Sequence, residues 1–482
     1  MKKWADLAIA QLAKKNIDYA DARAVTTTDQ RIMVRGERVE ALSESESRGL
    51  GIRVLAKGAW GFASTNQLTE AAVTACAERA VDIARASALT TTEPARLDDR
   101  LAERGEYTSP RRIDPEEVSR ERKIDLLVSA CREMERHSDI GSGKAHMQFM
   151  RERKVYVDTE GAEIKQDILH SGAALEAIAQ GGGDTQRVSY PNSHGGGWGS
   201  AGFELIEELN LPGNAGQTAA LAAELLAAPE CPRGEYDIIL AGPQLALQIH
   251  ESCGHPTELD RALGTEISLA GGSFMTPDRL GSLRYGSEKV NLYGDATIPG
   301  ALGSFGWDDE GVRAQRFDLV RDGIFVGYQM SRETAAALGL ASNGTMRAAG
   351  WSRLPLIRMT NINLAPDPRG PSLEELIADT KRGLLMDVNK SWSIDDLRLN
   401  FSFSCEYAYL IENGKRTKLL RNPVYVGITP RFWGSCDAVG NEQEWRVIGV
   451  PNCGKGQPMQ TARVGHGCSA ARFRGVTVGG AS

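Results

Sequence analysis

Two hairpin signals in the second half of the chain constrain its fold more than any other feature. Asp322-Gly323 and Asn413-Gly414 each lie between short runs of apolar, strand-like residues. Asp-Gly and Asn-Gly favour the type I′ turn, because both of its central residues need a positive φ. Two such hairpins predict a large, mostly antiparallel sheet in this half, and therefore an α+β fold instead of alternating α/β units.

The first half combines expected helices with expected strand pairs. The apolar spacing predicts helices over 3–15, 69–86 and 218–228, and Thr69 is expected to be the N-cap of the second. Strand-like runs predict the pairs 31–34 with 39–42, 49–55 with 59–63, and 155–158 with the segment after Gly161. Asp114-Pro115-Glu116-Glu117 has a capping Asp, a Pro at the first helical position and a Glu three residues after the cap, so it predicts the start of another long helix.

A proline-containing break, Pro229-Glu230-Cys231-Pro232, separates the two halves. At 482 residues the chain is too long for one ordinary hydrophobic core. We therefore expect an N-terminal α+β domain over 1–230 and a C-terminal catalytic domain, dominated by the antiparallel sheet, over 231–482.

Composition and charge argue against several classes of protein. A net charge of −7 and a pI near 5.7 give no electrostatic reason to expect nucleic acid or an anionic membrane as partner. No apolar run approaches the roughly 20 residues of a membrane span. The N-terminal helix is interrupted by Asp6 and Lys14 and is a poor signal peptide. Eight scattered cysteines do not form a disulfide framework, so we expect a cytoplasmic protein.

The chemistry concentrates in His250-Glu251-Ser252-Cys253-Gly254-His255, at the end of a helix that Gly242-Pro243 is expected to open. In the H-E-x-x-H pattern of zinc proteases the histidines are four positions apart and face the same way. Here they are five apart, which misaligns them by about 140° on an ideal helix. A π-bulge, or a helix end at Gly254 that lets the chain swing back, would bring the imidazoles together.

We expect His250 and His255 to hold Zn²⁺, with Glu251 as the general base that activates a zinc-bound water. The residues alone are equally compatible with structural imidazoles and a surface carboxylate. Cys253 is an alternative nucleophile. A catalytic zinc usually has three protein ligands, and the sequence leaves five candidates for the third: Glu258, Asp260, Cys453, His466 and Cys468.

Several ordered segments carry a resemblance to a known family: 51–54, 60–65, 250–255, 307–311, 358–361, 409–415, 453–455 and 476–480. Together they resemble the TldD/PmbA family, and specifically its TldD-like branch, over nearly the whole chain. The resemblance implies a zinc metallopeptidase with an H-E-x-x-x-H motif. It also implies the metal ligands His250, His255 and Cys453, with Glu251 as the catalytic carboxylate.

The resemblance further implies a partner and a substrate. TldD-like subunits pair with a PmbA/TldE-like paralogue that lacks the motif, so we expect either this heterodimer or a homodimer. The implied substrates are unfolded peptides or modified peptide precursors, cut with low sequence preference. Pairing of an extended peptide with a sheet edge would explain that tolerance. The alternatives are a non-catalytic peptide-binding or regulatory subunit, and a metal-dependent amidohydrolase acting on a non-peptide amide.

Other polar residues have weaker interpretations. The segment 308–310 either orients a metal ligand, binds a substrate amine, or is an exposed acidic loop. Arg358 is expected to form a structural ion pair, and His194 to belong to a flexible loop among glycines. His466 and Cys468 depart from the usual pattern of the family. We expect variation without function, and the alternatives are a competing metal ligand or a pair that supports the ligands from behind.

Overall fold

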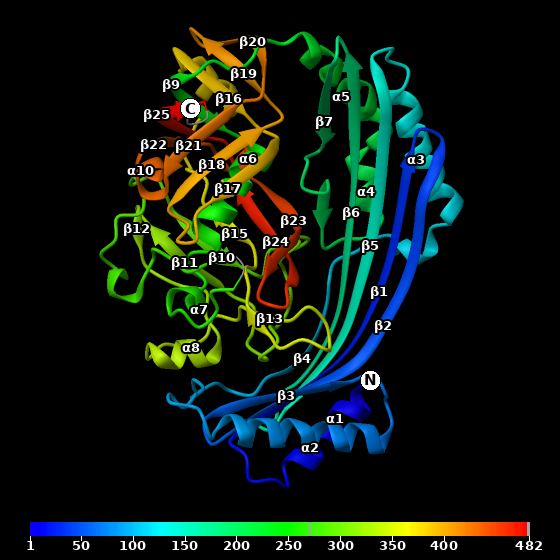
Figure 1. Ribbon diagram of the computed structural model, residues 1–482, viewed down its shortest axis with the longest axis vertical. Coiled ribbons are helices and arrows are strands. Elements are labelled where there is room, and N and C mark those ends of the chain that lie inside the picture. The colour runs from blue at the N-terminus through cyan, green and yellow to red at the C-terminus, as the bar shows by residue number, and fades with distance from the viewer. Residues whose placement is uncertain (269–270, 480–482) are drawn as a thin grey trace.

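Four long strands organise the N-terminal part of the computed structural model, which describes residues 1–268 and 271–479. They belong to an eight-stranded sheet in the order β3-β2-β1-β5-β6-β4, in which β7 and β8 also pair with β6. The bounds are β1 (Tyr19–Arg35), β2 (Arg38–Ala56), β3 (Ala59–Thr65), β4 (Arg104–Thr108), β5 (Ile140–Asp158), β6 (Glu163–Gly181), β7 (Asp184–Tyr190) and β8 (Gly197–Gly199). β1, β2, β5 and β6 run the height of the molecule in Figure 1.

Helices cover this sheet at two levels (Figure 1). At its base lie α1 (Lys2–Leu12) and α2 (Glu70–Ser87), and along its upper part lie α3 (Arg120–Met134), α4 (Glu204–Leu209) and α5 (Leu211–Ala227). Each level has its own apolar core, one between α1, α2 and β1–β3, and one between α3, α5 and β5–β6. Thr69 caps α2 as predicted, because its hydroxyl accepts a hydrogen bond from the Ala72 backbone.

Two expected boundaries in this part are wrong. The segments 39–42 and 49–55 belong to one continuous strand, β2, which pairs with β1 from Tyr19–Leu55 to Arg35–Arg38. Asp114 caps only a 3₁₀ turn, because Val118 is extended (φ −96°, ψ 125°) and stops it. The long helix α3 begins after Ser119, whose hydroxyl accepts a hydrogen bond from the Arg122 backbone.

The C-terminal part contains the expected large sheet, with the order β17-β18-β21-β25-β9-β16-β19-β20 and β22 paired to β25. All of its pairs are antiparallel except β9 with β16. The bounds are β9 (Gly234–Leu240), β16 (Arg382–Met386), β17 (Asn389–Ile394), β18 (Asn400–Cys405), β19 (Tyr407–Glu412), β20 (Lys415–Arg421), β21 (Val424–Ile428), β22 (Cys436–Val439) and β25 (Ala471–Val478). The predicted α+β class is therefore confirmed.

Smaller sheets and short helices complete this part. The four-stranded sheet contains β10 (Leu292–Asp295), β11 (Arg316–Arg321), β12 (Ile324–Phe325) and β15 (Ile362–Leu364), and the two hairpins are β13 (Met346–Arg347) with β14 (Leu356–Ile357) and β23 (Arg446–Lys455) with β24 (Gln460–Cys468). The helices are α6 (Gly242–Ile249), α7 (Leu259–Ala262), α8 (Arg332–Ala337), α9 (Leu373–Ala378) and α10 (Thr429–Gly434). Asp322, Gly323, Asn413 and Gly414 all have positive φ, as the predicted type I′ turns require.

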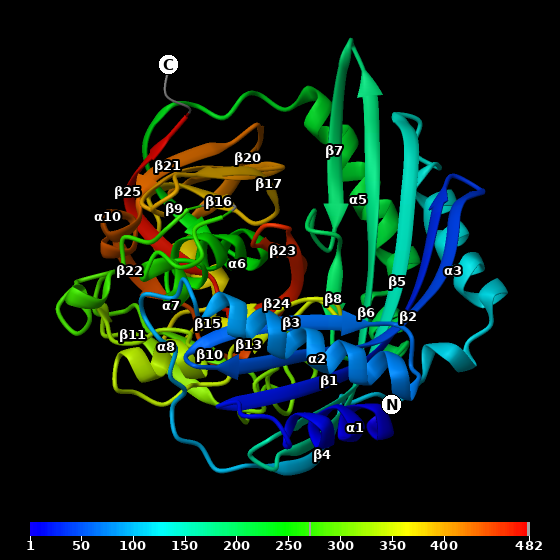
Figure 2. The same cartoon turned by 60° about the horizontal axis from the view of Figure 1, so that its bottom comes forward.

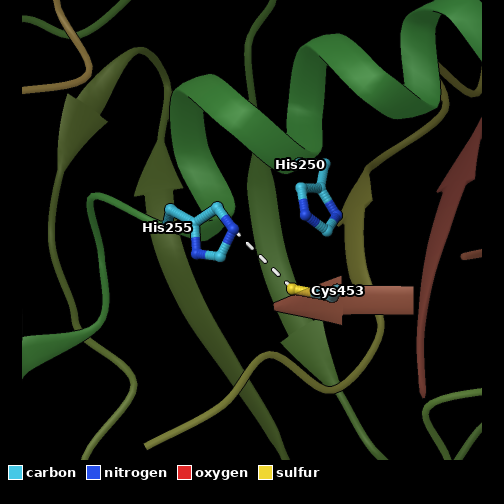
Figure 3. Close-up of side chains that lie close together, drawn as sticks. All are labelled: His250, His255 and Cys453. Carbon is cyan, nitrogen blue, oxygen red and sulfur yellow. Dashed lines mark hydrogen bonds between the residues drawn. The ribbon is translucent and has the colours of Figure 1, made fainter. Parts of the chain in front are cut away.

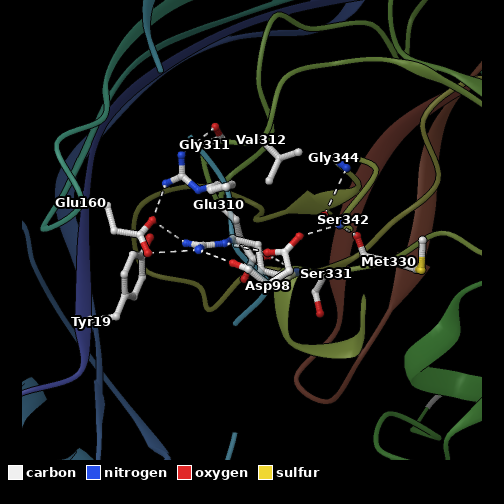
Figure 4. A network of polar contacts seen from close by, with 12 residues as sticks. Tyr19, Asp98, Glu160, Glu310, Gly311, Val312, Met330, Ser331, Ser342 and Gly344 are labelled. Carbon is white, nitrogen blue, oxygen red and sulfur yellow. Dashed lines mark hydrogen bonds and ion pairs between the residues drawn. The ribbon is translucent and has the colours of Figure 1, made fainter. Parts of the chain in front are cut away.

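A buried ion network joins the base of the long sheet to the C-terminal part (Figure 4). Arg332 binds Asp98 at 3.0 Å and Glu160 at 2.9 Å. Glu310 accepts hydrogen bonds from the Arg332 backbone and from Arg53. In the turned view of Figure 2, one end of β3 lies next to α8 of the C-terminal part, where Trp60 donates to Glu333 at 2.8 Å.

The acidic segment 308–310 belongs to this junction. Asp309 pairs with Lys154 at 2.8 Å, and all three acidic residues are at most 3% exposed. The segment is therefore not an exposed loop. It also does not orient His255, whose Nδ1 atom contacts Glu258 instead.

The predicted division at residue 230 falls in the connection between α5 and β9, and it stays a prediction. Gly480, which belongs to the last segment of the family resemblance, and residues 481–482 lie outside the described residues. No helix in the described part of the chain is long and apolar enough to cross a membrane.

Candidate metal centre

Three buried side chains from two elements meet next to the end of α6 (Figure 3). α6 packs against β23 and β24, and it continues into a π turn over His250–Gly254. The candidate ligand atoms of His250, His255 and Cys453 all lie within 4.8 Å of one another. The Cys453 Sγ atom is 3.7 Å from His255 Nε2.

The π turn explains how histidines five positions apart can face the same point. The backbone N–H of His255 donates to the His250 carbonyl at 3.1 Å, which is the i→i+5 bond of a π turn. Of the two arrangements that the sequence allows, the structure adopts the π-bulge. Gly254 does not end the helix as the other arrangement would require; instead it leaves room for Met359, because a Cβ atom there would lie 2.1 Å from the Met359 sulfur. Glycine thus lets Met359 pack directly against the turn.

The far side of each imidazole is engaged, which fixes its orientation. His255 Nδ1 lies 3.0 Å from a carboxylate oxygen of Glu258. His250 Nδ1 lies 2.8 Å from His466 Nε2, and His466 Nδ1 lies 3.0 Å from the Ile362 carbonyl. A carbonyl only accepts, so His466 Nδ1 carries a hydrogen and its Nε2 accepts from His250. The Nε2 lone pairs of His250 and His255 are left for a metal.

Two of the candidate third ligands, Glu258 and Asp260, are bound to other side chains. Glu258 accepts from Arg261 Nε at 2.8 Å and lies 3.4 Å from Lys455 Nζ. Burial opposes its ionisation, but Lys455 and His255 hold the pKa of Glu258 well below its usual range. Asp260 is bound by Lys455 at 2.7 Å. Glu258 therefore orients His255 from behind, and Asp260 belongs to an ion pair.

Cys453 differs electrostatically from the other seven cysteines, all of which lie in the described part of the chain. Burial opposes its ionisation, but Arg358 and His255 hold the pKa of Cys453 below its ordinary value. Burial raises the pKa of each of the others. Cys253 is fully buried and its pKa is raised, which argues against a role as the nucleophile. The Cys468 Sγ atom contacts the Gly242 carbonyl. Cys453 is thus the cysteine best suited to bind as a thiolate.

Arg358 supports Cys453 from the backbone side. Its guanidinium donates to the carbonyls of Cys453 and Gln460, and so connects β23 to β24. No carboxylate of the described residues lies within ion-pair distance of Arg358, so the expected structural ion pair is wrong. No local pattern indicates this role, because the partners are backbone atoms about a hundred positions away.

Glu251 lies beside the cluster and is held by an arginine that sequence analysis missed. Arg398, in the turn between β17 and β18, donates from Nη1 to Glu251 Oε2. Glu251 is 6% exposed, and burial opposes its ionisation, but Arg398 and the neighbouring imidazoles hold the pKa of Glu251 below its ordinary value. Arg398 has a left-handed backbone (φ 64°) in an ordinary charged turn, so no local pattern marks it.

A pocket of about 420 Å³ opens onto these groups. Its lining includes the edge-strand segment 392–394, the hairpin residues Val450 and Asn452, and His194 from the loop between β7 and β8. His194 does lie in a glycine-containing loop, as expected, but its side chain is 9% exposed and reaches the pocket from the N-terminal part. The candidate site therefore contains residues from both parts of the chain.

Three family models match the chain: PmbA/TldA metallopeptidase domain 1 over residues 20–84, the central domain over 113–228 and the C-terminal domain over 233–480. A metalloprotease of Methanocaldococcus jannaschii is 31% identical over 94% of this chain and 95% of its own length. A metalloprotease TldD homolog of Haemophilus influenzae is 27% identical, covering 97% and 94%. TldE from Thermococcus kodakarensis has the same fold, with a TM-score of 0.74 at 18% identity over 99% of this chain and 100% of its own.

Proposed function

The chain belongs to the PmbA/TldD metallopeptidase family, and on that basis we propose that it is a zinc-dependent peptidase. His250, His255 and Cys453 bind the metal, and Glu251 is the general base. One observation carries this proposal: three donor atoms converge while the opposite nitrogen of each imidazole is already engaged.

The donor set fits zinc. Two imidazole nitrogens and one thiolate are ligands that zinc accepts, and three protein ligands leave one coordination position open for catalysis. When bound, zinc supplies a Lewis acid that polarises the scissile carbonyl and lowers the pKa of a water molecule towards about 7. The engaged Nδ1 atoms of His250 and His255 keep their Nε2 atoms directed at one point.

Glu251 moves the proton. It accepts a proton from the attacking water as the new C–O bond forms, and it delivers that proton to the amine nitrogen as the C–N bond breaks. Arg398 holds one oxygen of this carboxylate, Oε2, and no donor of the described residues binds Oε1. Oε1 is therefore the oxygen that takes the proton. Because Arg398 binds Oε2, the orientation of the Glu251 carboxylate, and so of Oε1, is fixed.

We propose that the substrates are unfolded peptides or modified peptide precursors. β17 pairs only with β18 among the described strands, so its other edge is open, and its residues 392–394 line the pocket. An extended peptide that pairs with this edge is held through its main chain, and affinity then depends little on its side chains.

The proposal also covers the oligomeric state, the domain boundary and the location of the protein. The fold shared with TldE supports a dimer formed with a second copy or with a TldE-like relative. The gap between the central and C-terminal family models, at residues 228–233, supports a domain boundary near residue 230. We also propose a cytoplasmic location, with neither nucleic acid nor a membrane as partner.

The test of this function combines metal analysis with cleavage of a quenched fluorogenic peptide. Glu251→Gln should keep wild-type zinc content and lose turnover, because the ligands remain while the proton acceptor is gone. Glu442→Gln, which changes an exposed glutamate that does not line the pocket, is the matched control and should behave as wild type. Full-rate cleavage by Glu251→Gln would show that the role given to Glu251 is wrong.

A further inference from the structure

We propose that His194 is a catalytic residue whose imidazole donates a hydrogen bond to the scissile carbonyl oxygen as negative charge develops there. This inference rests on the peptidase function proposed above. It gives the N-terminal part of the chain a direct role in catalysis, since His194 lies between β7 and β8.

The position of His194 is the first argument. Its ring lines the same pocket as His250, Glu251 and His255. Its Nε2 atom is buried and has no hydrogen-bond partner among the described residues. Burying a polar atom without a partner costs free energy, so such atoms in a native structure call for an explanation. A substrate atom in the pocket would supply the missing partner.

The loop that carries His194 is fixed by its own hydrogen bonds. The side chain of Asn192 accepts from the His194 backbone at 2.8 Å and donates to the Gly196 carbonyl at 2.9 Å. His146 Nε2 lies 3.1 Å from the Gly195 carbonyl. These contacts hold the loop against the long sheet.

Two further contacts tie this loop to the wall of the pocket. Ser193 donates from its hydroxyl to the carbonyl of Asn389, the first residue of β17. The His194 ring lies 4.7 Å, centroid to centroid, from the ring of Trp392 on the same strand. The imidazole is therefore held in place before substrate arrives, which is what makes a donor effective in stabilising a transition state.

The ionisation of His194 suits a neutral donor. Burial, assisted by His250 and opposed by Glu251, lowers the pKa of His194 to about 4. The ring is then neutral at pH 7 and carries one N–H. A neutral imidazole can stabilise a developing oxyanion without adding a positive charge next to a cation site.

Two other polar groups next to the cluster are bound to protein atoms: Arg398 Nη1 to Glu251, and His466 on both nitrogens. His194 Nε2 has no such partner among the described residues. Water adds to the carbonyl carbon, Glu251 takes the proton and passes it to the departing amine, and His194 keeps its own proton throughout. His194 stabilises the charge on the carbonyl oxygen.

The experiment compares His194→Ala and His194→Gln with wild type and with His137→Gln. His137 is a partly exposed histidine outside the pocket. The measurements are kcat and KM on a quenched fluorogenic peptide, bound zinc per chain, and the inhibition constant of a phosphinic peptide, which mimics the tetrahedral transition state. Thermal unfolding of each variant confirms that it folds.

For His194→Ala we expect kcat to fall by about 10²–10³-fold, the usual loss for one oxyanion donor, with zinc content unchanged. KM should change by less than about threefold, because the hydrogen bond strengthens chiefly in the transition state, as negative charge develops on the oxygen. The phosphinic peptide should bind more weakly in parallel with the fall in kcat/KM. His194→Gln, which retains a side-chain N–H donor, should recover part of kcat, and His137→Gln should match wild type.

Three results would overturn this assignment. Loss of zinc from both His194 variants would make His194 a metal ligand. A kcat within about threefold of wild type, with Glu251→Gln inactive, would remove His194 from catalysis and leave the peptidase function intact. A zinc-loaded wild-type protein that cleaves no unfolded peptide would instead refute the peptidase function itself.

Discussion

The ion network around Arg332 and the candidate metal centre both join segments that lie far apart in the sequence, but their partners differ. In the network, cations and carboxylates are matched: Arg332 binds Asp98 and Glu160, and Arg53 binds Glu310. In the metal centre, by contrast, three metal-binding atoms, one each from His250, His255 and Cys453, lie within 4.8 Å of one another.

This difference distinguishes a structural cluster from a functional one. A buried network whose charges are matched holds the two parts of the chain together and needs nothing more. Buried donor atoms that converge on a common point are costly until a cation occupies it. The comparison therefore predicts that changes in the network affect stability, and that changes in the centre affect metal binding and turnover.

The largest effect is expected for Cys453→Ala. Loss of a direct ligand should lower zinc affinity by more than the roughly 10–100-fold typical of groups that only orient ligands, and should abolish cleavage. Competition with a chelator of known affinity measures the change. Cys468→Ala, another buried cysteine outside the group, is the control and should keep its zinc. Unchanged zinc affinity in Cys453→Ala would contradict the proposed ligand set.

Arg332→Ala should act on stability alone. It leaves the buried carboxylate of Asp98 without its cation, which costs about 3–5 kcal/mol of unfolding free energy. Arg313→Ala, which removes an exposed pair with Glu103, should cost less than about 1 kcal/mol. Denaturant unfolding compares the two variants. If the two variants lost the same unfolding free energy, or if Arg332→Ala lost zinc, the ion network would not be the purely structural cluster described here.

His466→Ala removes the acceptor that orients His250. We expect zinc affinity to fall by about 10–100-fold, as is usual when such a partner of a ligand is lost. The same competition assay measures it. If zinc affinity were unchanged, His466 would be the variation without function that the sequence suggested.

The smallest effect at neutral pH is expected for Arg398→Gln. Arg398 lowers the pKa of Glu251, so its removal raises that pKa. The base must be ionised to accept a proton, and the acid limb of the profile of kcat/KM against pH should therefore move to higher pH. Arg431→Gln, at an exposed arginine, is the control. An acid limb that stays in place would show that Arg398 does not tune Glu251.

Local patterns predicted the features that depend on near neighbours in the sequence. The Asp-Gly and Asn-Gly turns, the Thr69 cap and the need for either a π-bulge or a helix end before His255 all follow from residues a few positions apart. The break at Val118 did not, because an extended residue there leaves no mark in a favourable capping sequence.

The surroundings of the centre depend on distant contacts, and no local pattern predicted them. His466 lies 216 positions from His250, and Arg398 lies 147 positions from Glu251. His194 reaches the pocket only because its loop packs against β17. Such roles follow from how the sheets assemble, which the spacing of residues along the chain does not contain.

The proposed chemistry depends on one zinc ion bound between His250, His255 and Cys453. Diffraction data from crystals of zinc-replete protein, collected on both sides of the zinc absorption edge, would locate this ion. We predict one strong anomalous peak bonded to both Nε2 atoms at about 2.0–2.1 Å and to the Cys453 sulfur at about 2.3 Å. If no peak lies between these three side chains, or if other residues bind the ion, the proposed metal centre is wrong.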